Sequence, residues 1–164
     1  MAAVMTVKPG SGRLTIHGKR LVAQSMYAKG TSFLRAAILL DRQGPYDSVV
    51  LQLLCQGLEI VLKAFLLFRN YDSYASQLQK PIGHNLEKAT STAIREFGLR
   101  PLRPSATAEL RNLNRLYSRH LLRYGTPRDI ILDASTIPRR RVFRKAAAAL
   151  RLADRHLSKK HDAT

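Results

Sequence analysis

The segment from about residue 46 to residue 69 constrains the fold more than any other part of this chain. As a helix it would be apolar nearly all round, without the wide polar face that a surface helix keeps. Its apolar positions include Val50, Leu54, Leu58, Val61 and Phe65. A helix of this kind belongs in the middle of a bundle, because only neighbouring helices can bury all of its faces.

The polar residues of this central helix are not scattered. They follow one another at steps of four, three and four residues, which places them on one narrow stripe: Gln52, Gln56, Glu59 and Lys63. Glu59 precedes Lys63 by four residues, the favourable order for an ion pair on a helix. Two interpretations stay open, a line of side chains that faces water and a polar seam that faces a partner or a ligand.

Helical spacing of apolar residues predicts four further helices. They cover about residues 21–40, 85–97, 105–124 and 138–157. The first is expected to be interrupted or kinked at Gly30-Thr31 and to end at Gln43-Gly44-Pro45. The next is expected to begin at an Asn85 cap and to close at Gly98.

The fold class follows from these predicted helices and from the absence of strand patterns and internal repeats. No segment alternates with period two for long enough to indicate a sheet, and no internal repeat is visible. We therefore expect an all-α, up-down bundle of about five helices over residues 20–157. A flexible basic arm over residues 1–19 would precede the bundle, and a charged tail over residues 158–164 would follow it.

Charge is the compositional property that bears on function. The chain carries 28 lysines and arginines against 11 aspartates and glutamates, which gives a net charge of +17. Such an excess attracts polyanions, and nucleic acid is the commonest of these. The same excess also occurs on surfaces that serve only solubility, so net charge alone leaves both interpretations open.

Missing motifs exclude several kinds of chemistry. The only cysteine, Cys55, lies in an apolar stretch, which predicts a buried, inert thiol and no thiolate metal cluster. There is no Gly-rich phosphate loop, no HExxH and no GxSxG, so we expect neither a metal nor a cofactor. The N-terminal residues lack a signal-peptide pattern and no uninterrupted apolar run reaches membrane length, so we expect a cytoplasmic protein without a membrane span.

Candidate binding residues gather on the segment 105–124. His120 follows Tyr117 by three residues and precedes Tyr124 by four, so a regular helix would place all three on one side. Arginines recur there at every fourth position and would form a basic ridge: Arg111, Arg115, Arg119 and Arg123. Such a ridge beside aromatic rings could hold phosphate and stack a base. The alternative is an exposed arginine-rich face beside a histidine at the edge of the core.

The other four histidines have ordinary explanations. His17 lies in the arm. His156 and His161 lie at or beyond the end of the last helix, where the helix dipole favours cations. His84 directly precedes Asn85 and is expected only to complete the turn before that cap.

Three pieces of the sequence carry a family resemblance. They read LLCQGLEIVLKAFLLF at residues 53–68, GHNLEKATSTA at residues 83–93 and LNRLYSRHLLRYGTP at residues 113–127. In order and spacing they resemble the HEPN domains, a family of nucleotide- and RNA-associated helical proteins, over roughly residues 20–157. The resemblance implies a bundle of four or five helices that commonly forms homodimers. Many HEPN proteins are metal-independent ribonucleases that act as toxins, often beside a nucleotidyltransferase-like antitoxin, whereas others only bind nucleotides or partners.

The ribonuclease members carry an arginine, a polar residue directly after it, and a histidine four to six residues further on. Arg115 and His120 match this spacing, but Leu116 occupies the polar position, and Arg123-Tyr124-Gly125 looks more like members without the nuclease motif. In a catalytic site His120 would act as general base and Arg115 would offset phosphate charge. A regular helix would set these two side chains about 140° apart, so the helix would have to distort or a second subunit contribute.

These observations predict a homodimeric, HEPN-like helical module that binds RNA, a nucleotide or a protein partner without catalysis. A metal-independent ribonuclease of the toxin–antitoxin class is the alternative function. A third possibility is a scaffold whose basic surface serves only solubility or an acidic partner protein.

Overall fold

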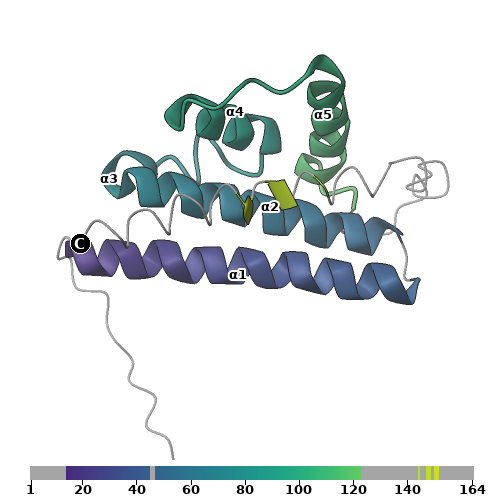
Figure 1. The fold of residues 1–164 in the computed structure, drawn as a ribbon, viewed down its shortest axis with the longest axis horizontal. Coiled ribbons are helices and arrows are strands. Elements are labelled where there is room, and N and C mark those ends of the chain that lie inside the picture. The colour runs from purple at the N-terminus through teal and green to yellow at the C-terminus, as the bar shows by residue number, and fades with distance from the viewer. Residues whose placement is uncertain (1–13, 45–46, 123–143, 145–146, 149, 152–164) are drawn as a thin grey trace, which may run out of the picture.

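Every regular element of the protein is an α-helix in the computed structural model, which describes residues 14–44, 47–122, 144, 147–148 and 150–151. The helices are α1 (Ile16–Gln43), α2 (Asp47–Arg69), α3 (Tyr71–Tyr74), α4 (Leu86–Glu96) and α5 (Pro104–Ser118) (Figure 1). The predicted all-α bundle is therefore confirmed for the described residues. Of the last predicted helix, Arg144, residues 147–148 and residues 150–151 are described, and they are helical. The remainder of that helix, residues 1–13 of the arm and the charged tail lie outside the described residues.

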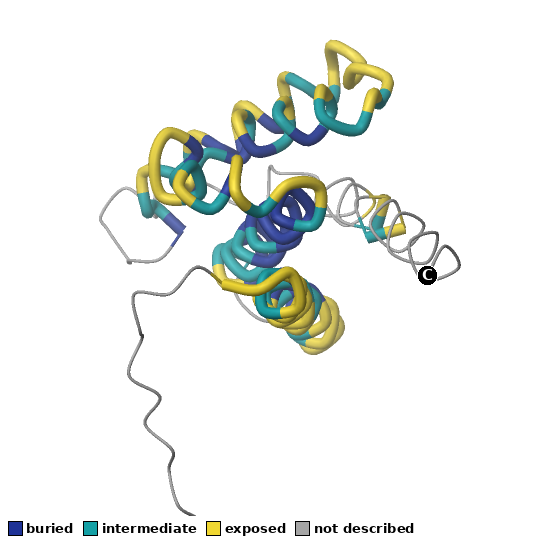
Figure 2. Tube along the Cα trace, turned by 90° about the vertical axis from the view of Figure 1, so that its left-hand side faces the viewer, coloured by how far each residue is buried: buried dark blue, intermediate teal, exposed yellow. Residues whose placement is uncertain are grey.

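The central position predicted for the apolar helix is confirmed. α2 packs against each of the other four helices, with α1 along one side and α4 and α5 across the other (Figures 1 and 2). Its buried residues occur on all sides of the helix, from Val50 to Leu67. The core therefore lies around α2, and the polar atoms of α2 must find partners on the surrounding helices.

α2 is also the helix that could cross a membrane by length and composition alone. Its most apolar window has a mean hydropathy of 1.8, and 72% of that window is buried inside the bundle. The core helix of a soluble protein passes the same test. The apolar character of α2 is accounted for by its packing against the surrounding helices.

α1 is continuous over 28 residues, so the interruption predicted at Gly30-Thr31 is wrong. Gly30 instead allows α1 to lie close to α2. A Cβ atom at Gly30 would stand 2.9 Å from the backbone nitrogen of Val61, and one at Gly57 would stand 2.7 Å from the side chain of Leu34. Both glycines are therefore required by the close approach of two backbones. α1 also begins at Ile16, within the segment that the sequence assigned to the arm.

Two predicted helix ends are confirmed in detail. The side chain of Asn85 accepts a hydrogen bond from the backbone N–H of Lys88 at 2.9 Å and caps α4. Gly44 adopts a left-handed conformation with φ of 69° at the end of α1, as the Gln43-Gly44-Pro45 pattern indicated. These caps fix where α4 starts and where the chain turns from α1 toward α2.

Candidate functional site

The buried carboxylate of Glu59 lies at the centre of a polar cluster inside the bundle. Its Oε1 atom accepts a hydrogen bond from the ammonium group of Lys63 at 2.6 Å. Its Oε2 atom accepts one from the hydroxyl of Tyr117 at 2.6 Å and lies 3.1 Å from Nδ1 of His84. One carboxylate thus joins α2, α5 and the turn before α4. With His120, described below, we call these residues the Glu59 cluster.

The pKa of Glu59 lies below its ordinary value of 4.5. Burial by itself raises this pKa, but the hydrogen bonds from Lys63, Tyr117 and His84, together with the charge of Lys63, outweigh it. Glu59 is therefore an anion at neutral pH, and its oxygens can only accept hydrogen bonds.

The ionised carboxylate fixes the tautomer of His84. Nδ1 of His84 carries the proton of the hydrogen bond to Glu59, so the tautomer that fits this contact has its lone pair on Nε2. The His84 side chain is 54% exposed, whereas that of Glu59 is only 5% exposed. A buried acid thus orients a histidine that solvent can reach. The expectation that His84 only completes a turn is wrong.

His120 stands beside His84 but is not part of α5. That helix ends at Ser118 with Arg119 as its C-cap, and His120 has a left-handed backbone with φ of 58°. The helix predicted to continue to residue 124 is therefore too long. Arg115 and His120 are therefore not separated by the roughly 140° of a regular helix, because His120 lies beyond the end of α5.

The ring of His120 contacts that of His84. Their centroids are 5.8 Å apart and the rings meet edge-on, with an interplanar angle of 70°. Nδ1 of His120 is buried and has no hydrogen-bond partner among the described residues. Leaving such an atom unpaired costs about 1–3 kcal/mol. The cluster therefore holds two neighbouring imidazoles, one oriented by a carboxylate and the other without a partner for its buried nitrogen.

The backbone motif that ends α5 at His120 also ends α4, where a glycine occupies the left-handed position. Gly98 has a φ of 58°, and the N–H of Leu99 bonds to the carbonyl oxygen of Ile94 at 2.9 Å. After α5 the N–H of Leu121 bonds to the carbonyl oxygen of Leu116 at 3.0 Å in the same pattern. This is the Schellman motif, in which glycine is usual because a Cβ atom is unfavourable there. Histidine at position 120 therefore costs stability that glycine would not.

Exchanging these two residue types should change stability in opposite directions. His120→Gly should raise the free energy of unfolding by roughly 1 kcal/mol, because it removes both the strained Cβ and the unpaired nitrogen. Gly98→His should lower it by about 1–2 kcal/mol, since a Cβ there meets no atom within 4 Å and only the backbone cost remains. Urea denaturation of both variants measures the two effects. A loss of stability in His120→Gly would show that the ring is held for packing.

The arginine surface consists of Arg111, Arg115 and Arg119, and all three side chains are exposed. Nε of Arg111 lies 3.5 Å from Oε2 of Glu87, which offsets part of its charge. Arg115 and Arg119 make no ion pair or hydrogen bond with any residue in the described part of the chain. Two uncompensated cations therefore lie on α5 and at its C-cap, five residues and one residue before His120. Arg123 and Tyr124, which complete the predicted ridge, lie outside the described residues.

Tyr117 takes a structural position that differs from its predicted role. It is only 1% exposed, and its hydroxyl is bound to Glu59. A side chain so deeply buried cannot stack on a base that approaches from solvent. The prediction that Tyr117 contacts RNA directly is therefore wrong, and its role is to hold the carboxylate of Glu59.

The Glu59–Lys63 half of the predicted polar stripe is buried inside the same chain. Glu59 is 4% exposed and Lys63 is 8% exposed, so the water-facing interpretation is wrong for this half of the stripe. Gln52 and Gln56 are half-buried, and Oε1 of Gln52 has no hydrogen-bond partner among the described residues. The seam therefore connects α2 with α5 and the turn before α4.

Asn114 is a site residue that sequence reasoning missed. It is buried on α5, where its Oδ1 accepts the N–H of Leu86 at 2.8 Å and its Nδ2 donates to Oε1 of Glu87 at 3.2 Å. Leu86 begins α4, and the first N–H groups of a helix have no partner within it. Asn114 therefore fixes α5 to the start of α4, next to His84.

Cys55 takes no part in this site. It is 0% exposed, and burial together with the nearby charge of Glu59 raises the pKa of its thiol far above the ordinary value. The prediction of a buried thiol is confirmed, and a thiol held protonated in this way is a poor nucleophile. The described residues also contain no group of three or more His, Cys, Asp or Glu side chains arranged to hold a metal ion.

Comparison of the chain with protein-family models, with curated proteins and with solved structures gave no match. The resemblance to HEPN domains therefore rests on the three sequence pieces alone. Two of those pieces contribute His84, Asn114, Tyr117 and His120, and the third contributes Glu59 and Lys63. The segments that carry the resemblance are thus the same segments that build the Glu59 cluster.

Proposed function

We propose that this protein is a HEPN-like module that binds RNA through its arginine surface, with the His84–His120 pair next to the bound phosphates. The observation that carries this proposal is a pair of exposed cations without partners among the described residues, Arg115 and Arg119, which precede His120 by five residues and by one residue. Guanidinium groups recognise phosphate because their N–H donors match its oxygens. The net charge of +17 would draw an RNA chain toward this surface.

RNA affinity should depend on these two arginines and on salt. Each phosphate contact on a single strand contributes about 0.7 to the slope of log affinity against log salt concentration. Changing Arg115 and Arg119 together to alanine should weaken binding and reduce that slope by roughly 1.4. Fluorescence anisotropy with a labelled single-stranded RNA at several salt concentrations measures both quantities.

Arg35 and Arg42 provide the matched control. Both are exposed arginines on α1, which packs on the other side of α2 from α5. Their joint change to alanine removes the same charge from the molecule but leaves the arginine surface intact. Equal slopes for the two double variants would mean that RNA recognises only net charge, which would contradict a specific site on α5.

A second candidate function is metal-independent RNA cleavage, and the arrangement of the two histidines favours it. Nε2 of His84 would take the proton of a ribose 2′-hydroxyl, and the resulting oxygen would attack the adjacent phosphorus. His120 would give a proton to the departing 5′-oxygen, so that the products are a 2′,3′-cyclic phosphate and a 5′-hydroxyl. Arg115 or Arg119 would stabilise the charge that develops on the phosphate. In this scheme His84, and not His120, is the general base.

The resemblance also leads us to propose a homodimer. Large apolar side chains are exposed on α1, among them Leu21 at 50%, Ile38 at 41% and Leu39 at 61%. An interface between two copies of the chain would remove such side chains from water. A nucleotidyltransferase-like partner and a cytoplasmic location are proposed from the resemblance and from the sequence pattern only.

A further inference from the structure

His84 has the hydrogen-bond partner that a metal-bound histidine usually has. Its Nδ1 donates to the carboxylate of Glu59, and its Nε2 has no hydrogen-bond partner among the described residues. Histidines that bind a metal through one nitrogen almost always donate the other N–H to a carboxylate, a carbonyl group or water. That hydrogen bond fixes the tautomer and the orientation of the ring. Nε2 of His84 is therefore held as a free ligand nitrogen.

The distance between the rings of His84 and His120 allows both to bind one ion. A metal bound at about 2.1 Å from an imidazole nitrogen lies roughly 3.2 Å from the centroid of that ring. Two rings that share the ion therefore have centroids no more than about 6.4 Å apart. The two centroids here are 5.8 Å apart, inside this limit. The side chain of His84 is 54% exposed, so an ion can reach the pair from solvent.

His120 has no hydrogen bond to lose when it binds a metal. Its buried Nδ1 has no partner among the described residues, and its left-handed backbone is one that glycine usually adopts. Unfavourable local features of this kind are often retained at functional sites. Coordination through Nδ1 would give that nitrogen a partner, and coordination through Nε2 would use the other lone pair of the ring.

We propose that His84 and His120 together bind one zinc ion, with Nε2 of His84 as one ligand and a ring nitrogen of His120 as the other. The described residues hold no group of three or more ligand side chains, so water would fill the other two positions of a tetrahedral site. Imidazole suits zinc, whereas magnesium prefers oxygen ligands. Two protein ligands make this site weaker than a structural zinc site, which has four.

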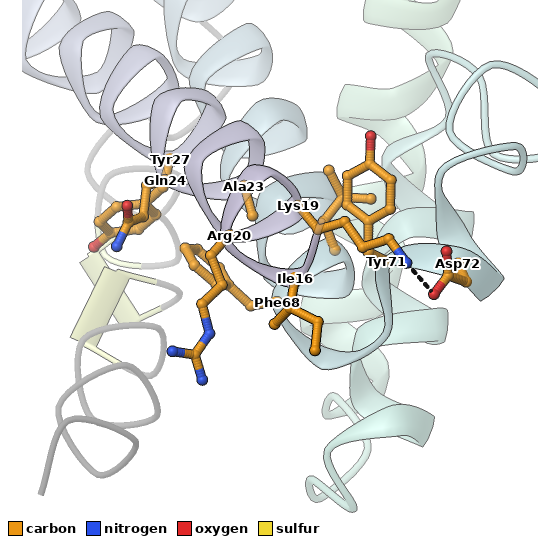
Figure 3. A pocket seen from close by; sticks show the side chains of 10 residues that line it. Ile16, Lys19, Arg20, Ala23, Gln24, Tyr27, Phe68, Tyr71 and Asp72 are labelled. Atoms are coloured by element: carbon orange, nitrogen blue, oxygen red, sulfur yellow. Dashed lines mark hydrogen bonds and ion pairs between the residues drawn. The ribbon is translucent and has the colours of Figure 1, made fainter. Parts of the chain in front are cut away.

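A cavity of about 440 Å³ at the start of α1 offers no comparable metal site (Figure 3). Among the described residues that line it there is no histidine or cysteine, and Asp72 has the only carboxylate. That carboxylate is already bound to the ammonium group of Lys19 at 2.6 Å. Arg20 also lines the cavity and adds positive charge, which repels a metal ion. The His84–His120 pair is therefore the better metal site of the two.

Zinc titration of a chain without a histidine tag tests the site. The chain has five histidines, so His17→Ala, His156→Ala and His161→Ala together leave only His84 and His120. We expect isothermal titration calorimetry of this triple variant to show one zinc ion per chain, unaffected by excess magnesium. Adding His84→Ala or His120→Gly should weaken zinc binding at least tenfold, because one imidazole is left. Absence of zinc binding in the triple variant, or equal affinity after either addition, would overturn the proposal.

The role of Glu59 as a positioning residue is tested with zinc as well. Glu59→Gln combined with Lys63→Met removes the carboxylate together with its buried counter-charge. The zinc affinity should fall by roughly 10-fold or more, because the ring of His84 loses its orienting partner. Asp72→Asn, which removes a carboxylate outside the cluster, should leave the affinity unchanged. Equal zinc affinity in the Glu59 and Asp72 variants, with helix content retained by circular dichroism, would overturn the assignment of Nε2 of His84 as a ligand.

Zinc binding and RNA cleavage can fail separately. In the second candidate function a zinc ion would occupy the nitrogen that takes the proton, so zinc should inhibit cleavage and a chelator should restore it. That consequence rests on the cleavage mechanism, whereas the calorimetry uses no RNA. A chain that binds zinc through both histidines but leaves RNA intact would support the metal site and reject cleavage. A chain that cleaves RNA but binds no zinc would overturn the metal site alone.

Discussion

Replacing Glu59 with glutamine is expected to lower the free energy of unfolding by about 3–5 kcal/mol at pH 7, the usual cost of removing one partner from a buried ion pair. The change would leave the ammonium group of Lys63, which is 8% exposed, without a counter-charge. It would also weaken the acceptor for the hydroxyl of Tyr117 and for Nδ1 of His84. Urea denaturation followed by circular dichroism measures the loss.

An exposed pair of the same length serves as the control. Lys19 and Asp72 also meet at 2.6 Å, but the side chain of Asp72 is 75% exposed. Asp72→Asn should cost no more than about 1 kcal/mol, since exposed ion pairs contribute little. Adding Lys63→Met to Glu59→Gln should restore much of the lost stability, because no buried charge then lacks a partner. Equal effects of Glu59→Gln and Asp72→Asn would contradict the view that burial makes Glu59 important.

The same carboxylate makes stability depend on pH. Because the pKa of Glu59 is lower in the folded chain than the ordinary value of 4.5, its contribution is fully present above that value and is lost as the pH falls below it. The wild-type protein should therefore lose stability on acidification below about pH 4.5 more steeply than Glu59→Gln. Parallel stability curves for the two proteins would mean that Glu59 is not stabilised as an anion.

The two histidines should each be required if the protein cleaves RNA. Removing a general acid or base typically lowers a rate by about 10²–10⁴-fold. We expect losses of this size for His84→Ala and for His120→Gly, a variant that suits the left-handed backbone at position 120 and should not destabilise the fold. His17→Ala, an exposed histidine on α1, is the control. Gel analysis of single-stranded RNA with a chelator present, and of the same RNA with a single 2′-deoxy substitution, measures the cleavage.

The outcomes distinguish an enzyme from a binding module. Cleavage that continues with chelator, stops at the 2′-deoxy position and fails in both histidine variants would establish the second candidate function. Intact RNA at protein concentrations that saturate binding would reject it and leave the binding function standing. Full activity in His120→Gly would assign proton transfer to other residues and contradict the paired mechanism.

Local sequence signals were sufficient to predict most of the helices and several of their ends. The apolar surface of α2 predicted a central helix because burial on all sides leaves no other position for it. Asn85 and Gly44 marked helix boundaries correctly because caps depend on a few neighbouring residues. Gly30 was misinterpreted, since its conformation is helical and its purpose is the close approach of Val61 and Gly57 on α2. A contact between two helices leaves no local signal in either one.

The candidate site was only partly predictable, because contacts between distant segments leave no local signal in the sequence. His120 occupies a left-handed position that usually carries glycine, so the sequence favoured a helix that continues past it. The contacts of Glu59 with His84 and Tyr117 span 25 and 58 residues. One signal was present, because a carboxylate on an otherwise apolar helix must find hydrogen-bond donors when it is buried. Lys63 could satisfy one oxygen locally, and the other had to be satisfied by distant residues such as His84.

Imidazole NMR tests directly whether RNA that binds Arg115 and Arg119 places its phosphates next to the His84–His120 pair. Nitrogen-15 spectra of the five histidines should be recorded while a short single-stranded RNA is added. The resonances of His84 and His120 should shift together along one saturation curve, and the shifts should disappear in the Arg115→Ala, Arg119→Ala variant. RNA that binds while the resonances of both histidines stay unchanged would show that its phosphates do not lie next to the His84–His120 pair.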